Sequence, residues 1–568
     1  MEAKFDKGSE WRVWDFHVHT PASFNWSGSR KLSNTDLNSD EDKEIVDEMI
    51  EALNKADADV FVLMDYFTFD GWIALQKRLS MPNHPKLLKV VFPGIELRLA
   101  SHKLPRLNAH VVFSDKITIT ELNDFKSRLT LDLVGKPLSD LSLIKYIREL
   151  PPSQLDSIDG DIINNDLDAL KASKQKAELT VQSWKEAVNM YPDKAVPYLA
   201  WSTHGGATSF TKDNYQYVFD LMRFANIFEV KNQEEALTFQ NIETDSNKLF
   251  LDEFQYCLGD KPCLAVRGSD AHRFKTSGED RGYAVFPGNN KTWIKADTTF
   301  EGLLQAIREP SNRSFIGDKP DKLKAIEGNS EKYLDRVCIS NHSSETAGEW
   351  FENIEQKLNS DLVAIIGNKG SGKSAFIDII SHVFEDKTDI KYNNFVKKFD
   401  TLNIGGNYKV NLDFMSNSEN LESYLSKNDA NVKDRITYIP QGYFEELCSD
   451  LSSNAFQNQI NSIVFSHVPS DKVLGSNDYN AFISQDERTI NKDILDVKGR
   501  IELISSEIVS YLNKTTSENE VKINNSLALE REKLEKASNE MQGLNTDIYG
   551  SLDDPLMKDV ELAHMEMR

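Results

Sequence analysis

Short apolar runs alternate with helical segments from Val13 to about Gly317, and this alternation restricts the fold more than any other feature of the chain. Strands that are separated by helices form a largely parallel sheet or barrel. We therefore expect an α/β domain, with a polar, helix-patterned insertion over about 130–190. The apolar runs that follow the one at Val13 are "ADVFVLMD", "LKVVFPGIEL", "NAHVVFS", "VPYLAWSTHGG", "NIFEVKN" and "PCLAVRGSDAH".

Composition limits the class of protein. A chain of 568 residues is too long for one hydrophobic core, so two or more domains are expected. Lys plus Arg number 66 against 90 Asp plus Glu, a net charge of -24, which excludes a simple nucleic-acid coat but leaves room for local phosphate sites. The four cysteines form no C-x-x-C pair, and no apolar signal core or membrane-length apolar run is present. We expect a soluble, cytoplasmic protein with reduced thiols and no membrane partner.

The alternating pattern breaks at the polar stretch "GDKPDKLKAIEGNSEKY". This break predicts a first domain over 1–317 and a linker over 318–333. A second α/β unit is expected over 334–485, beginning with "DRVCIS" and "DLVAIIGNKGSGKSAFIDII".

Over 486–568 the chain has the pattern of coiled-coil helices. Apolar residues recur at alternating spacings of four and three, first at Ile490, Ile494, Val497, Ile501, Ile504, Ile508 and Tyr511. After the polar break "NKTTSEN", a second seam follows at Ile523, Leu527, Leu534, Ala537, Met541, Leu544 and Ile548, with Glu530 in one slot. Either one interrupted helix or an antiparallel hairpin satisfies this pattern.

Two histidines, His17 and His19, stand one residue apart in "WDFHVHTPAS". Alternate side chains of a strand share a face, so this pair aims two imidazoles at one point. Imidazole is a common metal ligand, although two surface histidines can share this spacing by accident. Further ligand-type residues at or beside strand segments favour a metal site, and they are Glu96, His110, His204, Asp270 and His272.

In this order, the motifs "HVH", "PGIE", "THGG" and "GSDAH" resemble those of the PHP (polymerase and histidinol phosphatase) domain over roughly residues 10–317. The resemblance implies a distorted (β/α)7 barrel with a two- or three-metal phosphoesterase site. More narrowly, "TPASFNW", "MDYFTFDGW" and "TWIKADTTFEGL", with the ATPase module behind them, resemble TrlF-type PHP-ATPases. Relatives of that family act in bacterial phage defence.

The resemblance also implies ligands. His17, His19, Glu96 and Asp270 are expected to hold the first metal, and Glu96 to bridge to a second metal held by His110 and His204. The cofactors expected are two divalent metals, manganese or zinc. A third site is expected to be weak or absent, because Asn25 and Tyr66 stand where the family pattern has histidines and only His272 remains.

Several of these residues have a structural reading as well. His110 can serve as a satisfied core histidine, and Glu229 is expected to support a ligand or the fold rather than to bind metal. Asp15 and Asp65 are candidates to orient the imidazoles, although ordinary strand-end caps have the same appearance.

The segment "GNKGSGKS" has the G-x-x-x-x-G-K-S pattern of a phosphate-binding loop between an apolar run and a helical segment. Such a loop binds ATP with magnesium through backbone N–H groups, a lysine and a serine hydroxyl. The residues expected to bind are Gly367, Asn368, Lys369, Gly370, Ser371, Gly372, Lys373 and Ser374.

Downstream, Gln441 in "RITYIPQGYF" resembles the glutamine loop of SMC/ABC-like ATPases. No apolar strand that ends in Asp-Glu and no Ser-Gly-Gly signature follow it. We therefore expect either the N-terminal portion of a longer protein or a second lobe supplied in trans, with a homodimer implied by the resemblance. ATP binding is expected rather than turnover by this polypeptide alone.

The leading functional hypothesis is a metal-dependent phosphoesterase, a nuclease regulated by ATP binding, in phage defence or DNA repair. Its partner would be nucleic acid as the substrate. The first alternative is an ATP-gated DNA- or partner-binding protein with a structural metal domain. The second is a small-molecule phosphatase. Replacement of Asp270 discriminates the enzyme from the binding protein.

Overall fold

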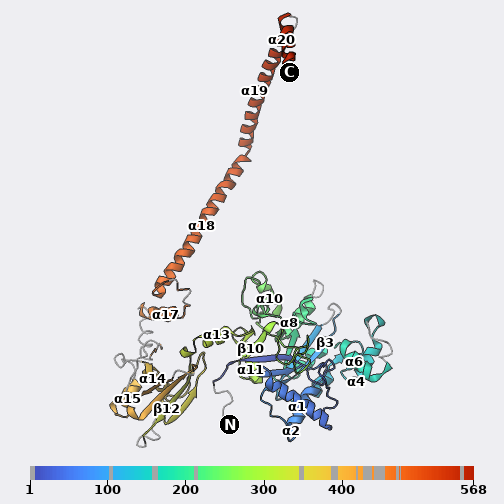
Figure 1. Cartoon of the computed structure of the whole chain (residues 1–568), viewed down its shortest axis with the longest axis vertical. Helices are drawn as coiled ribbons and strands as arrows, with labels where there is room; N and C mark the ends of the chain where they lie inside the picture. The colour runs from blue at the N-terminus through green and yellow to red at the C-terminus, as the bar shows by residue number, and fades with distance from the viewer. Residues whose placement is uncertain are drawn as a thin grey trace. The chain divides into compact units, whose positions relative to one another are not determined.

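The computed structural model divides the chain into two compact units, Met1–Tyr438 and Ile439–Arg568. The residues that it describes are 7–101, 107–155, 164–209, 215–343, 351–384, 394–416, 420–426, 436, 438–439, 454–468, 472–473, 475–550 and 555–567. Figure 1 shows the elements of both units.

The first unit is built on a nine-stranded, mixed sheet with the order β11-β10-β1-β2-β3-β4-β7-β8-β9. Pairing is parallel from β1 to β3 and from β7 to β9, and antiparallel where β4 meets β3 and β7 and where β10 meets β1 and β11. Every apolar run expected in the first domain contains a strand. The bounds are β1 Trp11–Val18, β2 Val60–Leu63, β3 Val90–Leu99, β4 Leu107–Phe113, β7 Ala195–Ala200, β8 Ile227–Glu229, β9 Leu264–Val266, β10 Lys291–Lys295 and β11 Ser314–Gly317.

The sheet curls until it is nearly closed. The chain that follows β9 returns to β1, where Asp270 N donates to His17 O and His19 N donates to Ala271 O, each at 2.9 Å. These two bonds join the ends of the β1 to β9 series, so seven strands surround a common interior. A mixed α/β fold with a barrel-like sheet is thereby established for this part of the chain.

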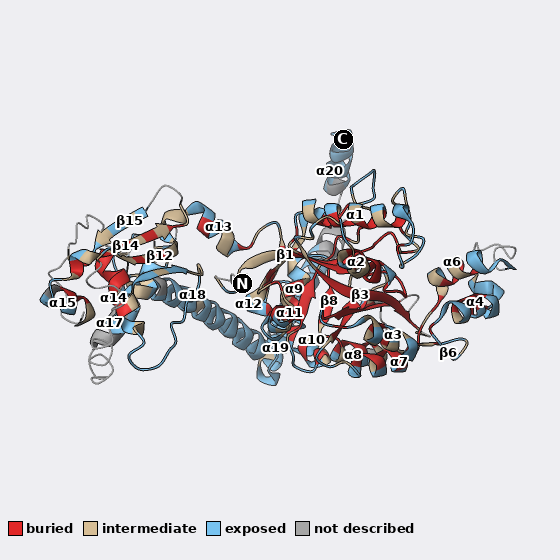
Figure 2. Ribbon diagram, turned by 90° about the horizontal axis from the view of Figure 1, so that it is seen from below, coloured by how far each residue is buried: buried red, intermediate tan, exposed pale blue. Residues whose placement is uncertain are grey.

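Alternate residues of the strands fill this interior with large apolar side chains. Trp14 and Phe16 of β1, Phe92 of β3 and Tyr198 of β7 belong to one buried cluster, which β10 and the helix α11 (Phe300–Arg308) complete. Figure 2 shows the strands of the barrel as almost wholly buried. Gly94 also faces this interior, where an added Cβ would lie 2.6 Å from Met64 Sδ. Only glycine therefore fits between these layers.

Helices cover the outer face through a second and larger apolar cluster. Several of them begin at side-chain caps: Ser39 Oγ, for example, accepts from Asp42 N at the start of α1. The helices are α1 Asp40–Lys55, α2 Asp70–Ser80, α3 Ile119–Arg128, α7 Val181–Asn189, α8 Tyr215–Phe224, α9 Gln233–Phe239, α10 Leu251–Leu258 and α12 Pro310–Arg313. The expected insertion contains β5 Thr130–Leu131, β6 Lys136–Pro137, α4 Asp140–Glu149 and α6 Asp166–Lys176 besides α7.

The segment expected as a linker is helical. The helix α13 (Asp321–Gly328) buries Ile326, and β12 follows after a short 3-10 turn. Its polar composition did not indicate this helix, because a single buried apolar residue leaves almost no periodic signal in the sequence.

A second, four-stranded antiparallel sheet has the order β13-β12-β14-β15. Its alternating side chains pack on the helices α14 (Lys373–Phe384) and α15 (Asn394–Thr401), with Val337, Ile379 and Tyr408 fully buried between them. The strands are β12 Leu334–Asn341, β13 Asn353–Lys357, β14 Tyr408–Phe414 and β15 Asn420–Tyr424.

The apolar run "LVAII" before the phosphate-binding loop forms no strand, contrary to the sequence expectation. Leu362 is 91% exposed and Ile366 is 89% exposed. An apolar run becomes a strand only when a neighbouring strand satisfies its backbone groups, and none of the strands in the described segments pairs with this one. The run is therefore extended chain with its apolar side chains uncovered.

The second unit consists of helices, α17 Asn454–Ser466, α18 Tyr479–Lys514, α19 Ser517–Gly550 and α20 Pro555–Glu566. The helix α18 stops where Thr515 N bonds back to Tyr511 O and Leu512 O, and α19 then continues in nearly the same direction (Figure 1). Of the two alternatives, the structure has the interrupted helix. Seam side chains from Ile490 to Tyr511 stay between 44% and 64% exposed. No helix among the described residues is long and apolar enough to cross a membrane.

We predict that Phe92→Ala destabilises the barrel by about 3–5 kcal/mol, because it removes a fully buried ring from the interior and leaves a cavity. Chemical denaturation followed by tryptophan fluorescence measures the change. Leu88→Ala, whose side chain is 65% exposed just before the same strand, serves as the control and should change stability by no more than about 0.5 kcal/mol. Equal effects of the two substitutions would contradict the described packing.

Candidate metal centre

A bulge in β1 aims the two histidines into the mouth of the barrel. Asp15 pairs with Phe61 and Val18 with Leu63, so β1 advances three residues while β2 advances two. The extra residue reverses the alternation of side chains. His17 and His19 therefore face the same interior as Trp14 and Phe16, although their positions differ by an odd number of residues.

Four ligand atoms converge at this mouth. Glu96 Oε2 lies 3.2 Å from His17 Nε2 and 3.6 Å from His19 Nε2. Asp270 Oδ1 lies 3.7 Å from His17 Nε2 and 3.6 Å from His19 Nε2. A tetrahedral ion with bonds of about 2.0–2.2 Å has edges of about 3.3–3.6 Å between its ligands. The structure thus brings together all four residues that were expected to hold the first metal.

The protonation of these groups follows from burial and from their mutual charge. Burial opposes ionisation of Glu96, but His110 and His17 hold the pKa of Glu96 well below its ordinary value. Burial likewise opposes the charge of Asp270, but His19 and His17 lower its pKa. Burial, followed by the charge of His272, lowers the pKa of His19 to about 4. The site therefore presents ionised carboxylates and a neutral His19, which are the forms that bind metal.

Unlike that of His19, the pKa of His17 is raised. Burial lowers the pKa of His17, but hydrogen bonds and charge from Glu229 and Glu96 outweigh burial and raise that pKa well above its ordinary value. His17 Nδ1 lies 3.3 Å from Glu229 Oε2, and His19 Nδ1 lies 3.8 Å from Asp65 Oδ1. Each histidine thus turns Nδ1 toward a second carboxylate and Nε2 toward the common point, an arrangement typical of metal-bound histidines.

Buried nitrogen atoms without hydrogen bonds support the same interpretation. Within the described part of the chain, His19 Nε2 and both ring nitrogens of His110 are buried and have no hydrogen-bond partner. Unpaired polar atoms at such depth are costly unless another group satisfies them. A divalent cation of the manganese or zinc type would do so, and the nitrogen and oxygen donors fit it.

Glu96 also faces the position expected for the second metal. It pairs in register with His110 across β3 and β4, and Glu96 Oε1 lies 3.7 Å from His110 Nε2. Asn108 Nδ2 donates to the same oxygen at 2.7 Å. His204 is placed differently: it lies exposed in the turn after β7, and the ligand groups found among the described residues do not include it.

Glu229 lies within ligand distance, which the sequence analysis did not expect. One ligand atom each from His17, His110 and Glu229 lie within 4.8 Å of one another, and all three side chains are buried. Strand alternation carried the missing signal, since Glu229 follows the inward-facing Ile227 by two residues on β8. Burial raises the pKa of Glu229, but the hydrogen bond and charge of His17 outweigh burial and lower it. Arg267, with Nη1 4.0 Å from Glu229 Oε1, adds to this lowering.

The outer position is formed by Asp270 and His272 beside His19. His272 Nδ1 lies 3.8 Å from Asp270 Oδ1, and the rings of His272 and His19 are 4.1 Å apart. Asn25 Nδ2 lies 3.4 Å from His272 Nε2, and Tyr66 stacks on His19 at 5.1 Å. An amide and a phenol thus stand around this position, as the sequence indicated.

Backbone geometry holds Asp270 in place. Its φ of 53° lies in the left-handed region, which is uncommon for residues other than glycine and is often found at functional sites. Asp15 supports the same loop, since its carboxylate accepts from Ser269 N at 2.9 Å and from Ala284 N at 3.0 Å. Gly268 lets the loop approach β1, because a Cβ there would lie 2.2 Å from His17 Cβ.

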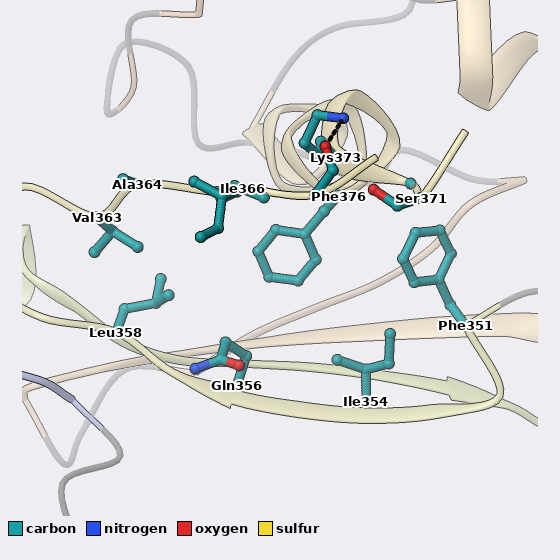
Figure 3. Close-up of a pocket in the computed structure, with 13 residues that line it drawn as sticks. Phe351, Ile354, Gln356, Leu358, Val363, Ala364, Ile366, Ser371, Lys373 and Phe376 are labelled. Atoms are coloured by element: carbon teal, nitrogen blue, oxygen red, sulfur yellow. Dashed lines mark hydrogen bonds between the residues drawn. The ribbon is translucent and has the colours of Figure 1, made fainter. Parts of the chain in front are cut away.

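The second candidate site is the glycine-rich loop. Lys373 Nζ donates to Gly367 O at 2.8 Å and to Asn368 O at 2.9 Å, and Gly370 and Gly372 have φ values of 85° and 89°. Figure 3 shows Lys373 and Ser371 at one end of a pocket of about 470 Å³ whose walls are mainly apolar. Among its walls are Phe351, Ile354, Leu358, Val363 and Phe376. Lys369 and Ser374 also lie in the described loop, whereas Gln441 lies outside the described residues.

No protein-family model and no curated protein matches the chain. An amidohydrolase from Chromobacterium violaceum, solved with bound sulfate and no metal, is similar over 48% of this chain and 90% of that chain, with 11% sequence identity and a TM-score of 0.27. A likeness at this level carries no argument about activity.

We predict that Glu96→Gln lowers the affinity for manganese by more than the factor of about 10–100 that the loss of an outer hydrogen-bond partner costs, because Glu96 faces both inner positions. Isothermal titration of chelator-treated protein measures the affinity. In the wild type, manganese at a hundredfold excess over Kd should stabilise the fold by about 2.7 kcal/mol, and Glu96→Gln should lose this gain.

The matched control is Glu301→Gln, because Glu301 is an exposed glutamate that pairs with Lys116 and belongs to none of the ligand groups found among the described residues. Its manganese affinity should equal that of the wild type. Unchanged binding in Glu96→Gln, or equal losses in both variants, would contradict the assignment.

Proposed function

We propose that the chain is a metal-dependent phosphoesterase that cleaves nucleic acid under the control of ATP binding. The observation that carries this proposal is the cluster at the barrel mouth, in which Glu96 faces His17 and His19 through one oxygen and His110 through the other. Shared carboxylates of this kind suit two neighbouring cations. Such cations supply a nucleophilic water at neutral pH and neutralise phosphoryl charge.

The roles of the protein's own groups follow from their positions. Glu229 and Asp65 keep the Nε2 atoms of His17 and His19 directed at the common point. Asp270 lies at the rim, with its side chain 39% exposed, where substrate can approach. In the reaction, the oxygen of water bonds to phosphorus as the water gives up a proton, and the bond from phosphorus to the leaving oxygen breaks. The leaving oxygen takes up a proton in turn, so protons balance.

Nucleic acid is favoured as substrate by the resemblance to TrlF-type proteins, whose PHP domain is joined to an SMC/ABC-like ATPase. In our proposal the loop from Gly367 to Ser374 binds ATP with magnesium, and Lys373 exchanges its bonds to loop carbonyls for bonds to phosphate. The proposal further includes a homodimer or a second ATPase lobe from another chain, a cytoplasmic location and a role in defence against phage or in DNA repair.

We predict that Asp270→Asn abolishes manganese-dependent cleavage, because the substitution removes a charge that His17 and His19 both face. The assay uses labelled single- and double-stranded DNA and RNA. The control Asp245→Asn changes an exposed aspartate and should retain full activity. If manganese is bound and no polymer is cut, the nuclease proposal fails, and hydrolysis of small phosphoesters or ATP-gated binding takes its place.

We also predict that Lys373→Ala removes ATP binding and any effect of ATP on cleavage, while cleavage without ATP continues. The reason is that this loop lysine is the cation placed to meet the β and γ phosphates. Equilibrium binding of a fluorescent ATP analogue gives the affinity. Lys397→Ala, at an exposed lysine on the outer side of α15, is the control. Retained ATP binding in Lys373→Ala would refute this part of the proposal.

A further inference from the structure

Arg281 lies beside Asp270, one of the candidate metal ligands. It belongs to the loop between β9 and β10, and Arg281 Nε donates to Ser269 O at 2.8 Å. This bond holds the guanidinium next to Asp270, with Arg281 Nη2 4.0 Å from Asp270 Oδ2. The other oxygen of Asp270, Oδ1, faces His17 and His19. Asp270 thus has the candidate metal position on one side and Arg281 on the other.

Most of the hydrogen-bonding capacity of Arg281 is unused. A guanidinium has five N–H donors, and only Nε–H has a hydrogen-bond acceptor among the described residues. The side chain is 34% exposed, so solvent or a ligand can reach its Nη groups. Arg267, by comparison, is 15% exposed and lies near Glu229, where it serves a buried carboxylate. Arg281 is therefore the arginine of this pair that is open to a ligand.

The position of Arg281 matters because the mouth of the barrel is rich in carboxylates. The protein carries a net charge of -24, and the mouth itself holds the carboxylates of Glu96, Glu229 and Asp270. A phosphate that approaches such a surface is repelled unless local positive charge offsets the carboxylates. Beyond the cations themselves, Arg281 supplies such charge at the rim. Its planar fork also matches two oxygens of one phosphate group.

We propose that Arg281 binds a non-bridging oxygen of the phosphate that the metal cluster hydrolyses. This inference rests on the proposed phosphoesterase function and adds the residue that recognises the substrate's charge. The competing explanation is that Arg281 only positions Asp270, in which case its loss would act through the metals. The two explanations differ in which ligand, phosphate or manganese, binds more weakly after substitution.

The test compares Arg281→Ala and Arg281→Lys with the wild type in two binding titrations. Manganese binding to chelator-treated protein should be unchanged in both variants. Inorganic phosphate should bind the manganese-loaded Arg281→Ala variant about 10- to 100-fold more weakly, the loss expected for a hydrogen bond between charged groups. Arg281→Lys should fall between, because an ammonium keeps the charge and loses the fork.

A kinetic measurement accompanies the titrations. With bis(p-nitrophenyl) phosphate as substrate, Arg281→Ala should lower kcat/KM, and added guanidinium ion should restore part of the loss. Arg273→Ala is the matched control, because Arg273 lies on the same loop but turns to Ser277 O and Asp280. Phosphate binding in the control should equal that of the wild type. Circular dichroism and thermal unfolding establish that each variant is folded.

The outcomes separate this inference from the proposed function. Weaker manganese binding in Arg281→Ala would make Arg281 a positioning residue for Asp270 and overturn the inference. Unchanged phosphate binding, or no phosphate binding by the wild type, would also overturn it. If the wild type hydrolyses ester and Arg281→Ala does so equally well, the function stands and the inference fails. If phosphate binds through Arg281 and no ester is hydrolysed, the inference stands and the function fails.

Discussion

The fold of the first unit depends on keeping several charged groups buried together at one end of a barrel. An isolated carboxylate in such a place would lose its hydration and become protonated. Glu96 stays ionised because His17 and His110 lie against it, and His17 in turn keeps its proton because Glu229 and Glu96 face it. The charges of this group thus offset one another at depth. The bulge in β1 and Gly268 are the backbone features that permit the loop of Asp270 to approach the histidines.

Much of this arrangement could be predicted from local patterns. Apolar runs predicted the strands, and ligand-type residues at their ends predicted a metal site. The assignment of His17, His19, Glu96 and Asp270 to a first metal position came from the family resemblance of the motifs. The register of β1 against β2 could not be predicted, because pairing partners distant in sequence determine it. Strand alternation on β8 indicated that Glu229 faces inward, but its approach to His17 spans 212 residues of sequence and could not be predicted. The placement of His204 depends on a turn that carries no periodic signal.

At the glycine-rich loop, the sequence motif predicted the loop itself but not the structure of the segment before it. Its motif is highly specific, and Lys373 lies over the loop as the motif requires. The apolar run before it was expected to be a strand, yet Leu362 and Ile366 are almost wholly exposed. Composition identified the right kind of segment, but strand formation needs a neighbour that the described residues do not provide. A local motif can thus be recognised even where the segment before it does not form the expected strand.

The closure of the barrel has a consequence for the order of folding. His17 lies near the beginning of the chain, whereas the loop that closes on it, with Asp270, is made more than two hundred residues later. During synthesis on the ribosome, one edge of β1 therefore stays unpaired until most of the domain has been made. Contacts of such high sequence separation form slowly. The four candidate ligands of the first metal position therefore come together only after Asp270 has been made and its loop has closed on β1.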